Sequence, residues 1–294
     1  MAEIIDGKQI SKEIKAELKL EIENLKQNGI TPGLAGVLVG DDPASALYVS
    51  MKEKACKKLG IYFEKIIKPQ DSPEADLLDL ITSLNNRDDI HGMLIQSPLP
   101  GHIDEGKAIL TIDPAKDIDG FHPVNQGLML AGKPSFLPAT PAGIVEMLWR
   151  SGNKTEGKHV VILGRGYLVG RPLAVLLALK NDKANATVTI CHSRTPNIAD
   201  YTRQADILVA AIGKAFFVKK DMVKPGAVVI DVGTNRIEDP SHPKGARLVG
   251  DVDFEQVKDV AKAITPVPGG VGPMTIAMVL TNTVKAAKLM SNNG

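Results

Sequence analysis

VVILGRGYLVGRP, residues 160–172, joins a run of four apolar residues to a glycine-rich turn. The apolar run predicts a buried strand at 159–163, and a helix is expected at 168–180. A strand, a glycine turn and a helix in this order build the phosphate loop of Rossmann dinucleotide-binding domains. Gly164 would permit the tight turn, and Gly166 would let the backbone approach a pyrophosphate at the helix N-terminus. Because the spacing is GxGxxxG rather than GxGxxG, an ordinary strand–helix turn is the alternative.

Strands and helices alternate on both sides of this loop. After it, the pattern predicts strands at 187–191, 207–211 and 227–232, a short strand near 248–249 and a last helix at 273–289. Before it, helices are expected at 8–28, 44–59 and 73–85, with strands at 33–39, 61–67 and 93–95. This alternation predicts an α/β protein with parallel sheets covered by helices. A Pro- and Gly-rich stretch at 113–141 predicts an irregular crossing between two domains.

The composition argues against several classes of protein. A net charge of +1 over 294 residues offers no field for nucleic acid or an anionic membrane surface. The apolar runs are far shorter than the ~20 residues that span a bilayer. Cys56 and Cys191 lie far apart, and the N-terminus lacks the pattern of a signal peptide, so a reducing cytoplasm is expected. The histidines show no metal-ligand spacing, so no metal is expected.

The end of the 187–191 strand favours one dinucleotide over another. NAD sites usually place Asp or Glu there to hold the ribose hydroxyls. Here the strand is followed by His192, Ser193 and Arg194. A serine hydroxyl together with Arg194 or Arg165 suits a 2′-phosphate, which a carboxylate would repel. We therefore expect NADP rather than NAD as the cofactor.

Four polar residues are candidates for proton transfer and substrate binding. Tyr48 and Lys52 are four residues apart on a predicted helix and share a face, where a lysine beside a phenol can transfer protons. A solvated helix face is the alternative. Gln96 follows a predicted parallel strand, where open α/β sheets place ligand groups, although it is equally typical of a loop amide. Asp119, in the crossing stretch, would accept hydrogen bonds from a nitrogen-rich ring or cap a turn.

Taken in order, the motifs along the chain resemble those of the methylenetetrahydrofolate dehydrogenase/cyclohydrolase family, over nearly the whole length. The motifs that carry the resemblance are VGDDPAS at 39–45 leading to Tyr48 and Lys52, QSPLP at 96–100, KDIDGF at 116–121, GR at 164–165 with VG at 169–170, CHS at 191–193 and TPVPGGVGPMT at 265–275. The resemblance implies an NADP-dependent dehydrogenase. It would oxidise 5,10-methylenetetrahydrofolate and then hydrolyse the methenyl product to 10-formyltetrahydrofolate, a supply for purine synthesis.

The same resemblance assigns roles to residues. Lys52 would transfer protons in the cyclohydrolase step and orient the folate, and Tyr48 would stack on the substrate. Gln96 would hydrogen-bond Lys52, and Asp119 would anchor the pterin ring. Gly272 and Pro273 would form part of the folate pocket wall. Arg165 and Ser193 would hold the 2′-phosphate, with the rest of the cofactor cleft lined by Thr140, Gly164, Gly166, Arg194, Thr234 and Thr275.

The resemblance also implies an organisation. A folate-binding catalytic domain would comprise 1–140 and 276–294, a Rossmann NADP domain would comprise 141–275, and long helices would join the two domains. The chain would form a homodimer. The chain departs from the family pattern at Ser97, Ala139, Gly166 and Thr234. Two rival functions are a plain NADP oxidoreductase acting on a small hydroxy compound and a non-catalytic nucleotide-sensing module. Both leave the set of Tyr48 and Lys52 with its partners, and the 265–275 loop, unexplained.

Overall fold

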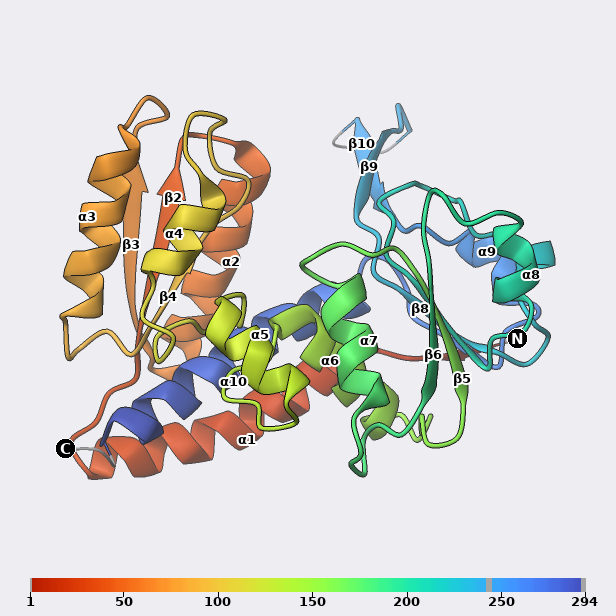
Figure 1. Ribbon diagram of the computed structural model, residues 1–294, viewed down its shortest axis with the longest axis horizontal. Helices are drawn as coiled ribbons and strands as arrows, with labels where there is room; N and C mark the ends of the chain where they lie inside the picture. Colours follow the sequence, from red (N-terminus) through yellow and green to blue (C-terminus); the bar gives the residue numbers. More distant parts are fainter. Residues whose placement is uncertain (1, 242–244, 292–294) are drawn as a thin grey trace. The chain divides into compact units, whose positions relative to one another are not determined.

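The computed structural model describes residues 2–241 and 245–291. The chain packs as two units, Met1–Lys12 with Thr140–Thr275 (unit 1) and Glu13–Ala139 with Ile276–Gly294 (unit 2). Each unit has its own parallel sheet (Figure 1). Helices α1 (Gly7–Gln27) and α10 (Val271–Ser291) begin in unit 1 and continue into unit 2, while α6 (Ala139–Arg150) begins at the boundary. The α/β class expected from the sequence is what the structure has.

Unit 2 is built on a three-stranded parallel sheet in the order β3 (Tyr62–Lys68), β2 (Gly33–Val39), β4 (Gly92–Ile95). The central strand β2 is buried along its whole length, which explains its unbroken apolar sequence. Helices α3 (Glu74–Asn85) and α4 (Glu105–Thr111) pack on one face through Leu77, Ile81 and Ala108. Helix α2 (Pro43–Leu59) follows β2 directly.

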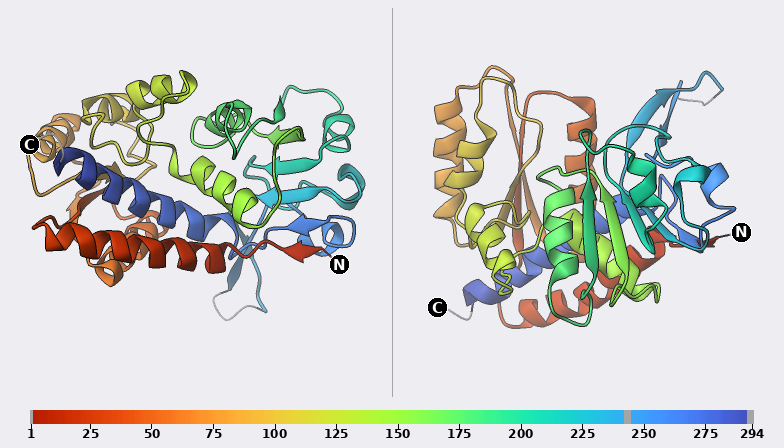
Figure 2. Two further views of the ribbon diagram at one scale, coloured as in Figure 1. Left: turned by 90° about the horizontal axis from the view of Figure 1, so that it is seen from below. Right: turned by 45° about the vertical axis from the view of Figure 1, so that its right-hand side comes forward.

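The two long helices lie side by side within unit 2. The last turns of α10 run along α1 (Figure 2), where Lys288 donates to Glu21 at 2.5 Å. The apolar stripe of α1, from Ile10 to Leu25, is buried at helical spacing, as its sequence periodicity predicted. No helix among the described residues is both long and apolar enough to cross a membrane.

Unit 1 has a six-stranded parallel sheet. Its order is β1 (Glu3–Ile4), β11 (Ala263–Ile264), β8 (Val228–Asp231), β7 (Ile207–Ala210), β5 (His159–Leu163), β6 (Thr187–Cys191). From β5 the chain moves to one neighbour, β6, and then crosses back to β7 on the other side. The carboxyl ends of β5 and β7 therefore form the switch point at which such sheets bind ligands. Helices α7 (Gly170–Ala178), α8 (Ile198–Thr202) and α9 (Phe254–Val257) belong to the same unit.

Several elements differ from the sequence expectation. Helix α7 starts at Gly170 rather than 168 and ends at Ala178. The stretch at 113–141 is not irregular throughout: it contains α5 (Pro123–Leu130), which begins with Pro123 at its first turn and with His122 as a side-chain cap. The short strand expected at 248–249 is one arm of an antiparallel hairpin, β9 (Asn235–Glu238) with β10 (Ala246–Val249).

The first residues of the chain also lie elsewhere than expected. Residues 1–12 were assigned to the folate domain, yet β1 pairs in parallel with β11 of unit 1. Ile5 continues this register, with its amide donating to Ile264 O at 2.9 Å. A two-residue strand carries too little pattern to show its partner in the sequence. Residues 292–294 of the predicted folate domain lie outside the described residues.

Candidate active site

Lys52 lies in the buried stripe of α2. That stripe consists of Ser45, Val49, Lys52 and Cys56, at the spacing of one helix face. The helix is fixed at its start by Asp42, whose carboxylate accepts from Ser45 N at 2.7 Å. Lys52 is only 8% exposed, whereas the Lys57 side chain on the same helix is 67% exposed. A solvated helix face therefore describes Lys57 but not Lys52. Tyr48, one turn before Lys52, is 38% exposed.

Gln96 meets Lys52 at the carboxyl end of β4. The Gln96 amide nitrogen donates to Val37 O at 2.9 Å, which continues the ladder with β2. Lys52 Nζ donates to Gln96 Oε1 at 3.1 Å, and Gln96 Nε2 donates to Ser97 O at 2.9 Å. The second bond fixes the orientation of the amide, because only its NH₂ group can donate to a carbonyl. The carbonyl oxygen of Gln96 therefore faces the ammonium group.

Two aspartates in the segment beside β4 have different surroundings. Asp117 is buried and accepts from Phe121 N at 3.2 Å, His122 N at 2.7 Å and Asn125 Nδ2 at 2.8 Å. Asp117 thus does the turn-capping that the sequence offered as an alternative for Asp119. The Asp119 carboxylate makes no hydrogen bond to any described residue. Burial raises the pKa of Asp119, the neighbouring Lys52 ammonium opposes this shift, and the Asp117 charge adds to it.

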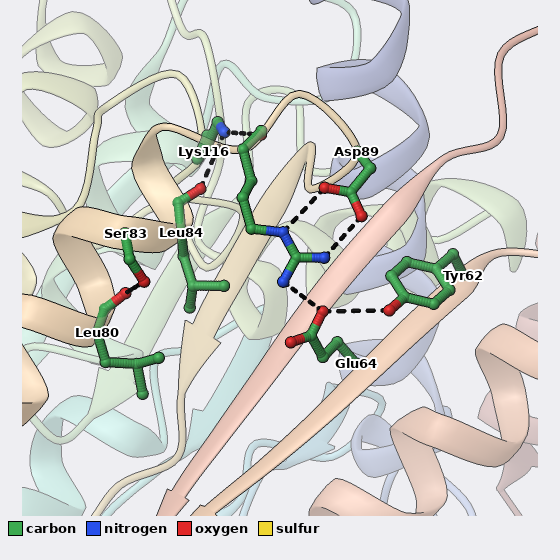
Figure 3. A network of polar contacts seen from close by, with 8 residues as sticks. Tyr62, Glu64, Leu80, Ser83, Leu84, Asp89 and Lys116 are labelled. Carbon is green, nitrogen blue, oxygen red and sulfur yellow. Dashed lines mark hydrogen bonds and ion pairs between the residues drawn. The ribbon is translucent and has the colours of Figure 1, made fainter.

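The segment that carries Asp119 is anchored to the end of α3 by a buried lysine, Lys116. Lys116 Nζ donates to Leu84 O at 3.1 Å and to Arg87 O at 2.5 Å, at the end of α3 (Figure 3). Arg87 in turn bonds Asp89 and Glu64, the latter at 2.7 Å, which ties the segment before β4 to β3. Met93 N donates to Lys116 O at 2.9 Å. Asp119 therefore projects from a segment held at two points.

A small cavity of about 20 Å³ lies beside Asp119, between β4 and α4. Ser97 and Glu105 both line it, and the Ser97 hydroxyl donates a short hydrogen bond to the Glu105 carboxylate. Ser97 is one of the departures from the family pattern. Its hydroxyl is satisfied by the Glu105 carboxylate, so the substitution leaves no unpaired polar group. The departure is compatible with the candidate site.

The glycines of the phosphate loop divide by function. Gly164 has φ +115°, and a Cβ there would lie 2.1 Å from Ala211 O. A Cβ on Gly170 would lie 2.1 Å from Gly164 O, so the close approach of loop and helix requires both glycines. A Cβ on Gly166 would meet nothing within 4 Å. The packing of the loop therefore does not require Gly166, and its lack of a side chain matters only toward a ligand.

The candidate residues for a 2′-phosphate are exposed. In the turn after β6, Thr195 Oγ1 accepts from His192 N at 3.0 Å, and Arg194 N donates to His192 Nδ1 at 3.1 Å. These bonds order the turn and leave the side chains of Ser193 and Arg194 exposed, as is that of Arg165 in the loop after β5. No acidic residue occurs at 191–195. The turn can therefore receive a phosphate without like-charge repulsion.

Other expected cleft residues also lie in unit 1. Thr140 and Thr275, at the starts of α6 and α10, share a hydroxyl hydrogen bond of 2.9 Å. Thr234 is exposed after β8, and Gly272 is exposed in the first turn of α10. Pro273 is half-buried, and its carbonyl accepts from Ser11 Oγ at 3.0 Å. The structure thus brings Tyr48, Lys52, Gln96 and Asp119 into unit 2 and the phosphate-loop set into unit 1.

Two family models match this chain. The tetrahydrofolate dehydrogenase/cyclohydrolase catalytic domain matches residues 5–119, and the tetrahydrofolate dehydrogenase/cyclohydrolase NAD(P)-binding domain matches residues 138–291. The chain belongs to the tetrahydrofolate dehydrogenase/cyclohydrolase family. The resemblance on which the sequence analysis relied is confirmed.

Individual members of the family match over almost their full length. The bifunctional protein FolD of Acetivibrio thermocellus is 52% identical over 290 residues, covering 99% of this chain and 98% of the relative. The structure of the FolD dehydrogenase/cyclohydrolase from Campylobacter jejuni has a TM-score of 0.93 at 46% identity, covering 98% and 99%. The Trypanosoma brucei FolD, complexed with NADP cofactor and inhibitor, has a TM-score of 0.94 at 40% identity, covering 100% and 99%.

Two buried carboxylates in the NAD(P)-binding domain of this family member were missed by the sequence analysis. Asp231 ends β8, and Asp251 follows β10. The sequence features that could have indicated them are the charged Asp231 at the end of an apolar run and Gly250 directly before Asp251. Within residues 2–241 and 245–291, no group of three or more His, Cys, Asp or Glu is placed to hold a metal ion.

Proposed function

We propose that this chain oxidises 5,10-methylenetetrahydrofolate to the 5,10-methenyl cation with NADP⁺ and then hydrolyses that cation to 10-formyltetrahydrofolate. The observation that carries the proposal is the buried Lys52 ammonium on Gln96 Oε1, with the unbonded Asp119 carboxylate near it. A plain hydroxy-compound oxidoreductase needs the phosphate loop and a proton acceptor, but it does not explain the match of both family models to this chain. The product would serve reactions that consume one-carbon units, such as purine synthesis.

The unit 2 groups suit a reduced pterin. Asp119 has unused acceptor positions for the ring N–H groups, and Tyr48 offers an exposed aromatic face for stacking. In the cyclohydrolase step, water adds to the methenyl carbon and the bond from that carbon to N5 breaks. Lys52 Nζ donates a proton to N5 as that bond breaks and takes one back from the hydroxyl of the adduct, while the other proton of the water leaves to solvent. Gln96 Oε1 holds Nζ in place. The catalytic roles of Lys52, Gln96, Tyr48 and Asp119 are part of the proposal.

The unit 1 groups suit NADP. The start of α7 offers the positive end of a helix dipole, and Gly166 leaves room for the backbone to meet a pyrophosphate. Ser193, Arg194 and Arg165 suit the 2′-phosphate. Bound NADP⁺ supplies the hydride acceptor, and the protein aligns and shields the reacting groups. The NADP cofactor named for the Trypanosoma brucei relative supports this choice.

We also propose that the folate domain lies within residues 1–140 and 276–294, with residues 2–12 packing on the sheet of the other unit, and that 141–275 act as the NADP domain. The chain is further proposed to act as a homodimer in the cytoplasm, as the family resemblance implies. Sedimentation of the purified protein would test the dimer, and a monomer at micromolar concentration would refute it.

The test of function is a spectrophotometric assay. The purified chain is mixed with 5,10-methylenetetrahydrofolate and NADP⁺, with NAD⁺ in parallel, and NADPH and the methenyl species are followed together. We expect NADPH without methenyl accumulation, and a lower kcat/KM with NAD⁺. NADP⁺ binding without turnover of any folate would favour a nucleotide sensor. Turnover of a small hydroxy compound and not of the folate would favour the plain oxidoreductase.

A pair of lysine variants then tests the assignment of Lys52. Lys52→Met should abolish methenyl hydrolysis, because it removes the amine that Gln96 Oε1 holds and that carries the proton to N5. Lys57→Met, one and a half turns along the same helix, should hydrolyse at the wild-type rate because Lys57 only bonds Glu53 at the surface. Full hydrolysis by the Lys52 variant would refute the role given to this lysine.

A further inference from the structure

Asp231 and Asp251 are buried carboxylates without a cation. They are 3% and 0% exposed, and no ion pair in the described parts of the chain involves either of them. Burying a charge is costly unless its lone pairs are satisfied. Here backbone and amide N–H groups satisfy them. The pattern of these donors shows what the two carboxylates hold in place.

Asp251 ties together two segments of unit 1. Its Oδ2 accepts from Ile212 N at 2.7 Å and Gly213 N at 3.0 Å, and its Oδ1 accepts from Lys214 N at 2.8 Å. These three consecutive amides lie in the segment that leaves β7. Oδ1 also accepts from Asn235 Nδ2 at 2.9 Å, at the end of the segment that leaves β8. One carboxylate thus fixes the two segments at 211–214 and 232–235.

Asp231 holds Asp251 in turn. Its Oδ1 accepts from Gly233 N and from Asp251 N, both at 2.9 Å, and its Oδ2 accepts from Val252 N at 3.0 Å. A Cβ on Gly250 would lie 1.7 Å from Asp231 Oδ2, and a Cβ on Gly233 would lie 2.4 Å from Asp251 Oδ1. The carboxylates are therefore packed against bare backbone, and side chains at 233 and 250 are excluded.

The place of these segments indicates their use. β7 and β8 lie on the far side of the switch point from β6, whose turn carries Ser193 and Arg194. A dinucleotide lying across the carboxyl ends of such a sheet puts its adenosine over the β6 side and its nicotinamide over the β7 and β8 side. Thr234, in the second segment, is exposed at this edge.

We propose that Asp251 is a positioning residue that sets the 211–214 and 232–235 segments against the nicotinamide half of the dinucleotide. Asp231 supports it by fixing its backbone. The inference rests on the proposed function, because it takes the dinucleotide to be NADP. It predicts that loosening Asp251 weakens the binding of the nicotinamide half and leaves the adenosine half unaffected.

The test is Asp251→Asn, measured by calorimetry with two probes. NADP⁺ carries both halves, whereas adenosine 2′,5′-bisphosphate carries only the adenosine half. Whichever way the substituted amide turns, its NH₂ faces two N–H donors. At the Oδ2 position both donors belong to the 211–214 segment, and at the Oδ1 position there is one from each segment, so the 211–214 segment shifts in either case. A shift of about 1 Å at a reacting group can cost on the order of 100-fold. We expect NADP⁺ binding and dehydrogenase kcat/KM to fall at least about tenfold, and bisphosphate binding to stay within about twofold.

Two controls separate positioning from general damage. Asp253→Asn makes the same substitution two residues away, where the carboxylate bonds Lys219 Nζ at 2.9 Å, and should bind both probes as the wild type does. Methenyl hydrolysis, assayed without nucleotide, should survive in the Asp251 variant. If Asp251→Asn does not fold, Asn235→Ala removes a single donor and should show the same selective loss at a smaller, several-fold size.

The outcomes are separable. Equal loss of both probes, or no loss of NADP⁺ binding, would overturn the positioning role. A wild-type protein that binds neither probe would overturn the proposed function instead, before any variant is made.

Discussion

Replacing Gly164 by alanine tests whether the phosphate loop depends on backbone that only glycine adopts. Two structural costs combine at this position. The φ of +115° is strained for an L residue, at about 1–3 kcal/mol. The new Cβ would also lie 2.1 Å from Ala211 O and 2.9 Å from Ala211 C. That carbonyl belongs to the residue after β7, and backbone cannot step aside as a flexible side chain can.

The size of the effect follows from that contact. Ala211 N donates to Leu163 O at 2.8 Å, so moving Ala211 disturbs the ladder between β5 and β7 at the switch point. Overpacking of this kind costs about 1–3 kcal/mol. Together with the backbone strain, the free energy of unfolding should fall by about 2–6 kcal/mol. At about 2–4 °C per kcal/mol, Tm should fall by roughly 4–24 °C.

Gly166→Ala is the matched control in the same loop. Its Cβ meets nothing within 4 Å, and its φ is not in the left-handed region. Thermal unfolding should therefore give a Tm at or slightly above that of the wild type. Calorimetric titration with NADP⁺ should show weaker binding for both variants, because both change the loop where the pyrophosphate is expected.

Two results would refute this reasoning. A Gly164→Ala protein with the wild-type Tm would show that the loop relaxes freely. A Gly166→Ala protein destabilised as much as Gly164→Ala would show that the two glycines do not divide the roles as the packing indicates.

Three further outcomes are expected. Ser193→Asp should lower kcat/KM for NADP⁺ by at least about tenfold, because the new carboxylate repels the 2′-phosphate. The ratio of kcat/KM with NADP⁺ to kcat/KM with NAD⁺ should therefore fall, and an unchanged ratio would argue against a phosphate site at Ser193. Burial, and to a smaller extent the Asp251 charge, raises the pKa of Asp231 to about 7. The folded state therefore binds one more proton than the unfolded state between about pH 4 and pH 7. The free energy of unfolding should fall by up to a few kcal/mol as the pH rises through that window. Asp231→Asn should therefore lose less Tm than the wild type between pH 5 and pH 8, and parallel pH curves would contradict the shift. Asn282→Leu should lower the free energy of unfolding, measured in urea, by about 2–4 kcal/mol. Asn282 Nδ2 donates to Ile118 O at 2.7 Å and to Leu137 O at 2.9 Å, and both carbonyls would lose this donor. A loss below about 1 kcal/mol would mean that water takes the place of the Asn282 amide.

The sequence predicted best those elements whose pattern is local. The bounds of β2, β5 and β6 match the expected ranges, because an apolar run bordered by turn residues is a local signal. The start of α7 was two residues off, because it depends on the close backbone approach of Gly170 to Gly164 O, which the apolar periodicity of the sequence does not report. Helix α5 was missed because its eight residues include Gly127 and lie among prolines and glycines that predict a loop.

The candidate site divides in the same way. Lys52 and Tyr48 share a helix, so their spacing was visible, yet the burial of Lys52 depends on packing against the sheet. The alternative roles offered for Asp119 could not be separated until Asp117 was seen to use its own acceptors on the turn. Asp251 carried almost no local signal, since its donors come from residues 16 to 39 positions away.

The way in which the two units share the ends of the chain has a consequence for biosynthesis. Residues 3–4 pair with residues 263–264 in unit 1, and Asn282 of the last helix closes unit 2. At about 5–20 residues per second, the first strand waits roughly 15–50 s for its partner. Unit 1 cannot be finished before residue 264 is made, and unit 2 cannot be finished before residue 282 is made, so neither unit can complete its fold from the N-terminal half of the chain alone. A nascent chain that stops short of its last helix exposes apolar surface in unit 2. Such truncated products should be bound by chaperones and removed by proteases more readily than those of a protein whose domains are contiguous in sequence.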